Sequence, residues 1–301
     1  MKKFKVVVPA GIGDFSWIWS KLSTIPDTEW IVYPPDTFPE RTSAYLKLLP
    51  RIKGVLGQHT YSDILVWGNK FIGKTWKETV ENCKDETFIY LQANEHLGHG
   101  KPLASWMPDL ATDYHYPINY KSDFKLPEGK YVAFHMASMR GIRAYNAWLP
   151  ETWADFLQAF HKMFPDWKFV AMGGAWDVDT VWELEGILDD KFPLINLVGK
   201  TKIEDAIKII KNADYYMGFS SGLNCIANVV STPCCALWPK EQMELMYSHV
   251  DPAMVATRDY MGFLYDSPHR VFLRIKNKLK EINKCSTEGT QEEALSSSVK
   301  T

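Results

Sequence analysis

The loop Gly218–Asn224, with the sequence Gly-Phe-Ser-Ser-Gly-Leu-Asn, combines small polar residues with a central glycine. It is predicted to join a strand, Tyr215–Gly218, to a helix, Leu223–Val230. The amide groups in the first turn of a helix have no partner inside the helix and attract anions, so this position suits a phosphate group. A purely structural cap by the serines is the alternative, but the loop holds more small polar residues than a cap requires. We therefore predict that a phosphate-bearing small molecule binds here, at Ser220, Ser221, Gly222, Leu223 and Asn224.

A second glycine turn, Gly11-Ile12-Gly13-Asp14, lies where the first predicted strand, Phe4–Val8, gives way to a helix. Such loops, at the carboxyl ends of parallel strands, line the ligand crevice, and glycines such as Gly13 let a ligand approach the backbone. The turn lacks the third glycine of a dinucleotide-binding fingerprint. The Asp14 carboxylate then has two interpretations. It caps the helix, or it is a general base that takes a proton from an attacking hydroxyl group.

A serine and two arginines follow the strand predicted at Tyr131–His135, namely Ser138, Arg140 and Arg143. A loop in this position lies beside the ligand crevice of a parallel sheet. Arginine forms paired hydrogen bonds with phosphate oxygens. These residues are either contacts of a diphosphate or the charges of a solvated loop.

Two further turns are predicted to open on the same edge of that sheet. Gly173-Gly174 ends the strand Lys168–Met172, and Gly199-Lys200-Thr201 follows the strand Leu194–Asn196. Gly174, Lys200 and Thr201 could therefore enclose a base and a ribose, or they could form ordinary turns.

Polar side chains also gather in the first half of the chain, in the stretch 94–100. Asn94, Glu95 and His96 are predicted to form a pocket for a polar acceptor, with a surface loop as the alternative. His96 and His99 have a spacing that a metal site could use, but no third ligand presents itself. We expect no metal site.

The composition sets limits on partners and compartment. The 301 residues are 46% hydrophobic and carry a formal net charge of −2, so no global basic field indicates nucleic acid. The odd number of cysteines and the absence of a Cys-x-x-Cys pair favour free thiols in a reducing cytoplasm. The apolar run near the N-terminus, Val6–Val8, is too short for a signal peptide or a membrane span.

Strands alternate with helices of about ten residues in both halves of the chain, which predicts an α/β protein with two doubly wound parallel sheets. The polar stretch Asp123–Lys130 separates the halves and is predicted to be a linker. The expected organisation is an N-terminal Rossmann-like domain over 1–125, a C-terminal Rossmann-like domain over 126–265, a helix over 266–283 and a disordered polar tail over 284–301.

The order of these motifs resembles the heptosyltransferase-like family of GT-B glycosyltransferases, also called glycosyltransferase family 9. Gly13-Asp14 is similar to that family's Gly-Asp, and the segment Ser220–Leu223 stands where the family has Asp-Ser/Thr-Gly-Pro/Leu. Three further segments are similar to the family's Trp-Pro-x-Glu-x-Trp segment, its strand ending in Gly-Gly and its Asn-Leu-x-Gly-Lys-Thr segment, and a fourth to its Thr-Pro strand: Trp148–Ala154, Phe169–Asp177, Ile195–Thr201 and Thr232–Pro239. The chain departs from the pattern at Ser220, where the family has an acid, and at Cys225, where it has a histidine.

The resemblance implies two Rossmann-like domains that face a cleft, with the acceptor on the N-terminal domain and a nucleotide-diphosphate sugar on the C-terminal one. It implies an inverting sugar transfer to a hydroxyl group of a glycan or lipopolysaccharide-like acceptor, with Asp14 as the base and neither a metal nor another cofactor. The C-terminal helix is expected to pack back toward the N-terminal domain. We expect a cytoplasmic protein without a transmembrane segment, either free or peripheral at the inner face of a membrane, with no obligate nucleic-acid partner.

Three alternatives remain open at this point. The chain could glycosylate modified DNA bases, as some viral GT-B enzymes do. It could be a nucleotide-sugar epimerase of the same fold. It could also bind a nucleotide sugar without catalysis, since the departures at Ser220 and Cys225 fall in the expected donor site.

Overall fold

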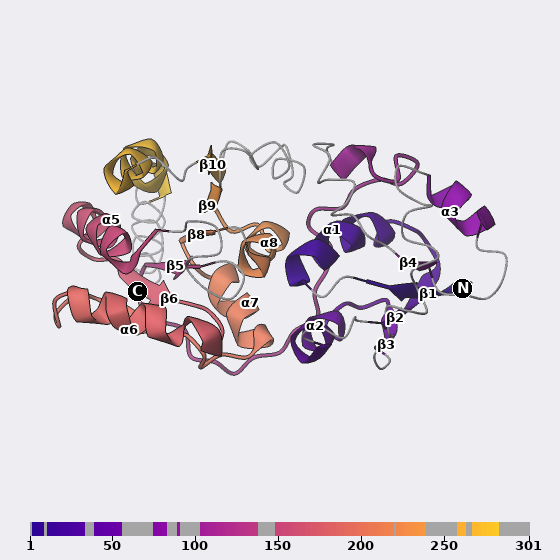
Figure 1. The fold of residues 1–301 in the computed structure, drawn as a ribbon, viewed down its shortest axis with the longest axis horizontal. Coiled ribbons are helices and arrows are strands. Elements are labelled where there is room, and N and C mark those ends of the chain that lie inside the picture. The colour runs from indigo at the N-terminus through magenta and orange to yellow at the C-terminus, as the bar shows by residue number, and fades with distance from the viewer. Residues whose placement is uncertain are drawn as a thin grey trace, which may run out of the picture.

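The structure is a computed structural model that describes residues 2–8, 11–33, 39–55, 75–82, 89–90, 103–137, 148–219, 221–238, 258–262 and 267–282. Within these residues the chain forms two parallel sheets, one in each half, and the helices of each half pack around its own sheet (Figure 1). The alternation of strands and helices in the sequence predicted this plan. The expected disordered tail, residues 284–301, lies outside the described residues.

The N-terminal sheet has the strand order β3-β2-β1-β4. Its strands are β1 Lys2–Val7, β2 Thr28–Tyr33, β3 Ile52–Val55 and β4 Ile89–Tyr90. All three strand pairs are parallel, so the carboxyl ends of the strands share one edge. The helices of this half are α1 Ile12–Leu22, α2 Pro39–Leu46 and α3 Trp76–Asn82. Helix α1 begins at Ile12, within the predicted glycine turn, with Gly11 as its N-cap residue, and Asp14 lies in its first turn.

Aromatic rings fill the core of this half. The ring of Trp30, on β2, stacks on Phe4 of β1 at a centroid distance of 5.2 Å and lies 5.8 Å from Trp76 of α3. Trp30 is fully buried. A large ring that is removed from water contributes strongly to stability, and it fixes the sheet against α3.

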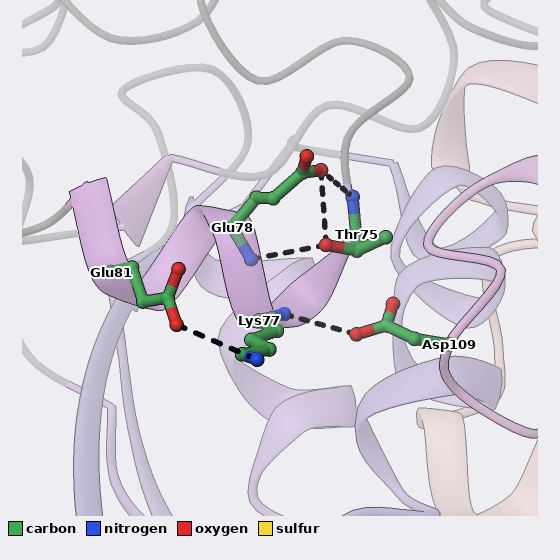
Figure 2. Close-up of polar contacts among 5 residues, drawn as sticks. All are labelled: Thr75, Lys77, Glu78, Glu81 and Asp109. Carbon is green, nitrogen blue, oxygen red and sulfur yellow. Dashed lines mark hydrogen bonds and ion pairs between the residues drawn. The ribbon is translucent and has the colours of Figure 1, made fainter.

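The first turn of α3 is capped from two sides (Figure 2). The Glu78 carboxylate accepts a hydrogen bond from the Thr75 amide (2.8 Å), while the Thr75 hydroxyl accepts one from the Glu78 amide (3.0 Å). The Asp109 carboxylate accepts from the amides of Trp76 (2.7 Å) and Lys77 (3.0 Å). The amide groups that a helix start leaves unpaired are thus satisfied here, and Asp109 ties α3 to the segment that leads to the second half.

The C-terminal sheet has the strand order β10-β9-β8-β5-β6-β7, and all of its strand pairs are parallel. Its strands are β5 Tyr131–His135, β6 Lys168–Ala171, β7 Leu194–Asn196, β8 Tyr215–Phe219, β9 Cys234–Trp238 and β10 Arg258–Gly262. Its helices are α5 Pro150–Met163, α6 Val178–Ile187, α7 Ile203–Lys211 and α8 Gly222–Val229. Strand β5 lies between β6 and β8, where the strand order reverses, and ligands of this class of sheet bind at that point.

The helix over 268–282 packs on the C-terminal half (Figure 1). The ring of Phe272 lies 6.1 Å from Phe156 and 6.0 Å from Phe160, both on α5. The expectation that this helix packs back toward the N-terminal domain was therefore wrong. The apolar residues of this helix, including Phe272 and Ile275, belong to the hydrophobic core of the C-terminal half.

The segment 103–130 connects the two halves and contacts both of them. The Asp113 amide donates to the Ser20 carbonyl on α1 (2.7 Å), and the side-chain amide of Asn228 on α8 donates to the Tyr114 carbonyl (3.1 Å). The predicted linker, Asp123–Lys130, contains neither helix nor strand. At its end Gly129 has φ +78°, a conformation that glycine adopts without strain.

The two halves meet directly where α1 packs against α8. A Cβ atom at Gly222 would lie 3.0 Å from Ile12 Cβ and 3.5 Å from the Gly13 amide nitrogen, and one at Gly13 would lie 3.9 Å from Gly222 Cα. The first turns of both helices therefore touch, and glycine at 222 permits this approach.

Replacing Gly222 with alanine is expected to lower the free energy of unfolding by about 1–3 kcal/mol, because the new methyl group forces α1 and α8 apart. The matched control is Gly186→Ala in α6, where an added Cβ meets nothing within 4 Å. That substitution should raise stability by about 0.5–1 kcal/mol, since alanine favours a helix over glycine. Urea unfolding of both variants measures the difference. Equal effects of the two substitutions would contradict the close contact.

Candidate active site

The first turns of α1 and α8 bring two positive helix ends together between the two halves of the molecule. Gly13 and Gly222 form the contact. Each helix end carries unpaired amide hydrogens and a partial positive charge of about half an elementary charge. Two such ends side by side create a place where an anion is favoured.

Asp14 is the carboxylate at this place, in the first turn of α1. Its Oδ2 lies 2.5 Å from the position that a Cβ of Gly11 would occupy, so the side chain folds back over Gly11. Asp14 makes no hydrogen bond or ion pair with any of the residues that the structure describes, so the structure does not show it acting as a cap. Burial raises the pKa of Asp14 from an ordinary value of 3.8 to about 6, because the charged form loses water. At neutral pH it is a largely ionised, poorly solvated carboxylate that is able to accept a proton.

Ser221 precedes α8 and occupies the N-cap position with an extended backbone, φ −155° and ψ 170°. Its hydroxyl makes no capping hydrogen bond to that turn. Instead its Oγ lies 3.2 Å from Nδ1 of His135. The first turn of α8 therefore lacks the side-chain cap that serine usually provides. The Asn224 amide donates to the Ser221 carbonyl (3.1 Å), which leaves the amides of Gly222 and Leu223 to face a ligand.

Asn224 lies in the same first turn and is buried, with 5% of its surface exposed. Its side-chain nitrogen Nδ2 has no hydrogen-bond partner within the described part of the chain. A buried polar group without a partner costs about 1–3 kcal/mol, so an amide left in this state beside an anion-attracting helix end is a reasonable contact for a ligand.

A buried hydrogen-bonded pair of side chains continues from Ser221 into the sheet. His135, the last residue of β5, places Nε2 3.2 Å from Oδ2 of Asp177, in the short 3-10 helix Ala175–Asp177. Oδ2 of Asp177 also accepts a hydrogen bond from the Gly174 amide (2.9 Å). The chain Ser221–His135–Asp177 thus links the ends of three neighbouring strands, β8, β5 and β6.

The glycine turns on the far side of β5 lie next to each other, as the sequence predicted. The Gly199 amide donates to the Gly173 carbonyl (3.1 Å). Gly174 joins the Asp177 carboxylate, whereas Lys200 extends along its own strand and donates to the Asn196 carbonyl (2.9 Å). The structure therefore brings Gly174 into contact with the chain that leads to Ser221, whereas the hydrogen bond of the Lys200 side chain stays within its own turn.

Several predicted residues lie outside the described part of the chain. These are the predicted donor residues Ser138, Arg140, Arg143 and Ser220 and the predicted acceptor residues Asn94, Glu95 and His96. Their roles stay predictions. His135 and Asp177 were missed by the sequence analysis, although a histidine at the carboxyl end of a central strand and an aspartate after a Gly-Gly turn were visible signals.

In the described residues, no group of three or more histidine, cysteine, aspartate or glutamate side chains is arranged to hold a metal ion. None of the described helices combines the length and the apolar character that crossing a membrane requires.

The sequence matches the model of a protein family, and the fold matches solved structures. The model of glycosyltransferase family 9 (heptosyltransferase) matches residues 73–259, more than half of the chain. No curated protein matches the sequence. Among solved structures, ADP-heptose lipopolysaccharide heptosyltransferase II of Escherichia coli aligns with a TM-score of 0.66 at 16% identity, over 93% of this chain and 99% of that one. A family 9 glycosyltransferase of Veillonella parvula aligns with 0.60 at 13% identity, over 93% and 97%.

A third structure, E. coli heptosyltransferase WaaC with ADP, aligns with a TM-score of 0.54 at 11% identity, over 93% of this chain and 99% of that one. At these identities the likeness establishes the fold. The predicted architecture, GT-B with two Rossmann-like domains, is confirmed.

Replacing Asp14 with asparagine is expected to stabilise the protein at neutral pH. The pKa of the buried carboxyl group is raised to about 6 in the folded protein, above its value of 3.8. Ionisation therefore costs stability as the pH rises from about 4 to 6, and the cost is fully present above that range. The gain from Asp14→Asn should be on the order of 2 kcal/mol at pH 8 and close to zero at pH 4.

Urea unfolding at both pH values measures this gain. The matched control is Asp190→Asn at an exposed position, which should change stability by less than about 0.5 kcal/mol at either pH. A gain from Asp14→Asn that did not depend on pH would show that burial does not raise the pKa of this carboxyl group.

Proposed function

We propose, from the premise that the chain belongs to glycosyltransferase family 9, that it transfers a sugar from a nucleotide-diphosphate sugar to a hydroxyl group of an acceptor, with inversion at the anomeric carbon. The observation that carries the proposal is the environment of the Asp14 carboxylate. It is a partly buried, poorly solvated carboxylate with a raised pKa, placed beside the touching first turns of α1 and α8.

The donor is proposed to bind along the carboxyl edge of the C-terminal sheet. Its diphosphate lies at the first turn of α8, where Ser221, Gly222, Leu223 and Asn224 offer amide and side-chain donors. The base and the ribose lie toward the adjacent turns that contain Gly174, Lys200 and Thr201. From the sequence, Ser138, Arg140, Arg143 and Ser220 are added as further contacts of the diphosphate.

The reaction follows from this placement. Asp14 takes the proton of the acceptor hydroxyl, whose oxygen forms a bond to the anomeric carbon while the bond from that carbon to the diphosphate breaks. The negative charge that grows on the leaving diphosphate is stabilised by the first turns of α8 and α1, with Gly13 at their contact, and by the arginines. We propose that this positive charge replaces a metal ion and that no other cofactor takes part.

The acceptor is proposed to approach from the N-terminal domain, where Asn94, Glu95 and His96 would contact it. A glycan or a lipopolysaccharide-like molecule fits the family, and such an acceptor would place the protein in the cytoplasm, free or at the inner face of a membrane.

Nucleoside diphosphates and their sugars are expected to raise the melting temperature of the protein, because a ligand that binds the folded state stabilises it by mass action. A panel with different bases should show one preferred base, measured by thermal shift. Ser221→Ala and Gly222→Val should both weaken that response, whereas Gly186→Ala should keep it. The absence of a response to every member of the panel would overturn the proposed donor site.

The rate of transfer is expected to rise with pH as Asp14 loses its proton, up to about tenfold per pH unit below pH 6 and with a plateau above it. Asp14→Asn should lower kcat by a factor of about 10²–10⁴ and remove this dependence, while the affinity for the donor changes little. The measurement is the release of nucleoside diphosphate from the preferred donor with deacylated lipopolysaccharide or oligosaccharide acceptors. Full turnover by Asp14→Asn would disprove the role as base.

A further inference from the structure

The buried pair His135–Asp177 has no role in the reaction proposed above. His135 nevertheless contacts Ser221, a residue of the proposed donor site. His135 and Asp177 are 7% and 3% exposed. Burying a charged or polar pair costs free energy unless its hydrogen bonds are satisfied. Here both ring nitrogens of His135 are engaged, by Asp177 on one side and Ser221 on the other, each at 3.2 Å.

The positions of the hydrogens on His135 and Ser221 follow from which of the hydrogen-bonding atoms can donate and which can only accept. A carboxylate accepts hydrogen bonds and has none to donate, so Nε2 of His135 carries a hydrogen and donates it to Asp177. In a neutral ring Nδ1 is then an acceptor, and the Ser221 hydroxyl donates to it. In a protonated ring Nδ1 carries a second hydrogen and donates it to Ser221 Oγ.

These two states change what Ser221 offers to a ligand. When His135 is neutral, the hydroxyl hydrogen of Ser221 points at the ring, and only lone pairs face away from it. When His135 is protonated, the hydroxyl hydrogen is free to point away from the ring and to donate to an anion. A phosphate oxygen accepts hydrogen bonds, so it favours the second state.

We propose that the chain Asp177–His135–Ser221 is a proton-linked switch in which binding of the donor's diphosphate is coupled to the uptake of one proton from solvent by His135. His135 and Asp177 are then positioning residues that act through Ser221, and Ser221 is the residue that contacts the phosphate. The proposal rests on the proposed function, since it requires a diphosphate at the first turn of α8.

The other groups around this chain do not supply the proton, as far as the described residues extend. Tyr216, on β8, faces Ser221 and Asp177, and burial raises the pKa of its hydroxyl well above the ordinary range, so it stays neutral. Cys225 of α8 and Cys234 of β9 are thiols that also interact with Tyr216. Asp14 titrates near pH 6 because burial raises its pKa. The protons that Asp14 takes up on binding are therefore subtracted by comparing the wild type with a variant at His135.

The test is calorimetric titration of the wild type and of His135→Asn with the nucleoside diphosphate that gives the largest thermal shift, in buffers of different ionisation enthalpy. Asparagine at 135 can still donate from its amide to Ser221 but cannot titrate. The protons taken up by Asp14 and by the phosphates are the same in both proteins. The wild type should therefore take up more protons per site than the variant, by a few tenths to about one. Equal uptake would overturn the switch while the donor site stands.

Ser221→Ala tests the same point without disturbing the pair His135–Asp177. Loss of a hydrogen bond to a charged ligand should lower the affinity about tenfold or more at pH 6. In the proposed switch, loss of the proton from His135 turns the hydroxyl toward the ring, so the loss of affinity should be smaller at pH 8.5 than at pH 6. An affinity ratio that stayed constant over this range would overturn the switch. His269→Asn, at an exposed position, is the control and should behave as the wild type. If no nucleoside diphosphate binds the wild type at all, the proposed donor site fails and the switch fails with it.

Discussion

The close contact between Gly13 and Gly222 is the constraint on which the rest of the site depends. A residue with a side chain at position 222 would press on Ile12 and hold the first turns of α1 and α8 apart. With glycine there, two partial positive charges face the same space, and they repel each other unless an anion lies beside them. The partial positive charge at these helix ends therefore favours an anionic ligand, such as a diphosphate, over an uncharged one.

Asp14 shows which of two opposing effects dominates at this contact. A helix N-terminus stabilises a nearby carboxylate by about 0.3–1 kcal/mol, which would lower the pKa. Burial acts in the other direction, and it raises the pKa of Asp14 to about 6. Since about 1.4 kcal/mol corresponds to one unit of pKa, desolvation outweighs the helix end. A carboxylate that lay in water at the same helix start would be more stable but a weaker base.

The sequence was informative where a residue's role depends on its own neighbours along the chain. The glycine turn before α1, the strand and helix that flank Ser221, and the paired turns at Gly174 and Gly199 were all predictable from local pattern. The link of His135 to Ser221 and Asp177 was not, because the three residues stand 86 and 42 positions apart and meet through the order of the strands. The prediction that the C-terminal helix packs toward the N-terminal domain was wrong for a related reason. An apolar face shows that a helix packs on another element, but it does not show which element that is.

The order of the strands also explains why a histidine stands at position 135. Only a residue at the end of the central strand β5 has neighbours on both sides, at the ends of β8 and β6. To connect them it needs two hydrogen-bonding atoms on opposite sides of a rigid group, and imidazole has that geometry. A lysine there could donate but not accept, and it would fix Ser221 in one state. The two protonation states of an imidazole ring would give Ser221 two orientations without any movement of the backbone, so the topology of the sheet and the chemistry of one side chain together support the proposed switch.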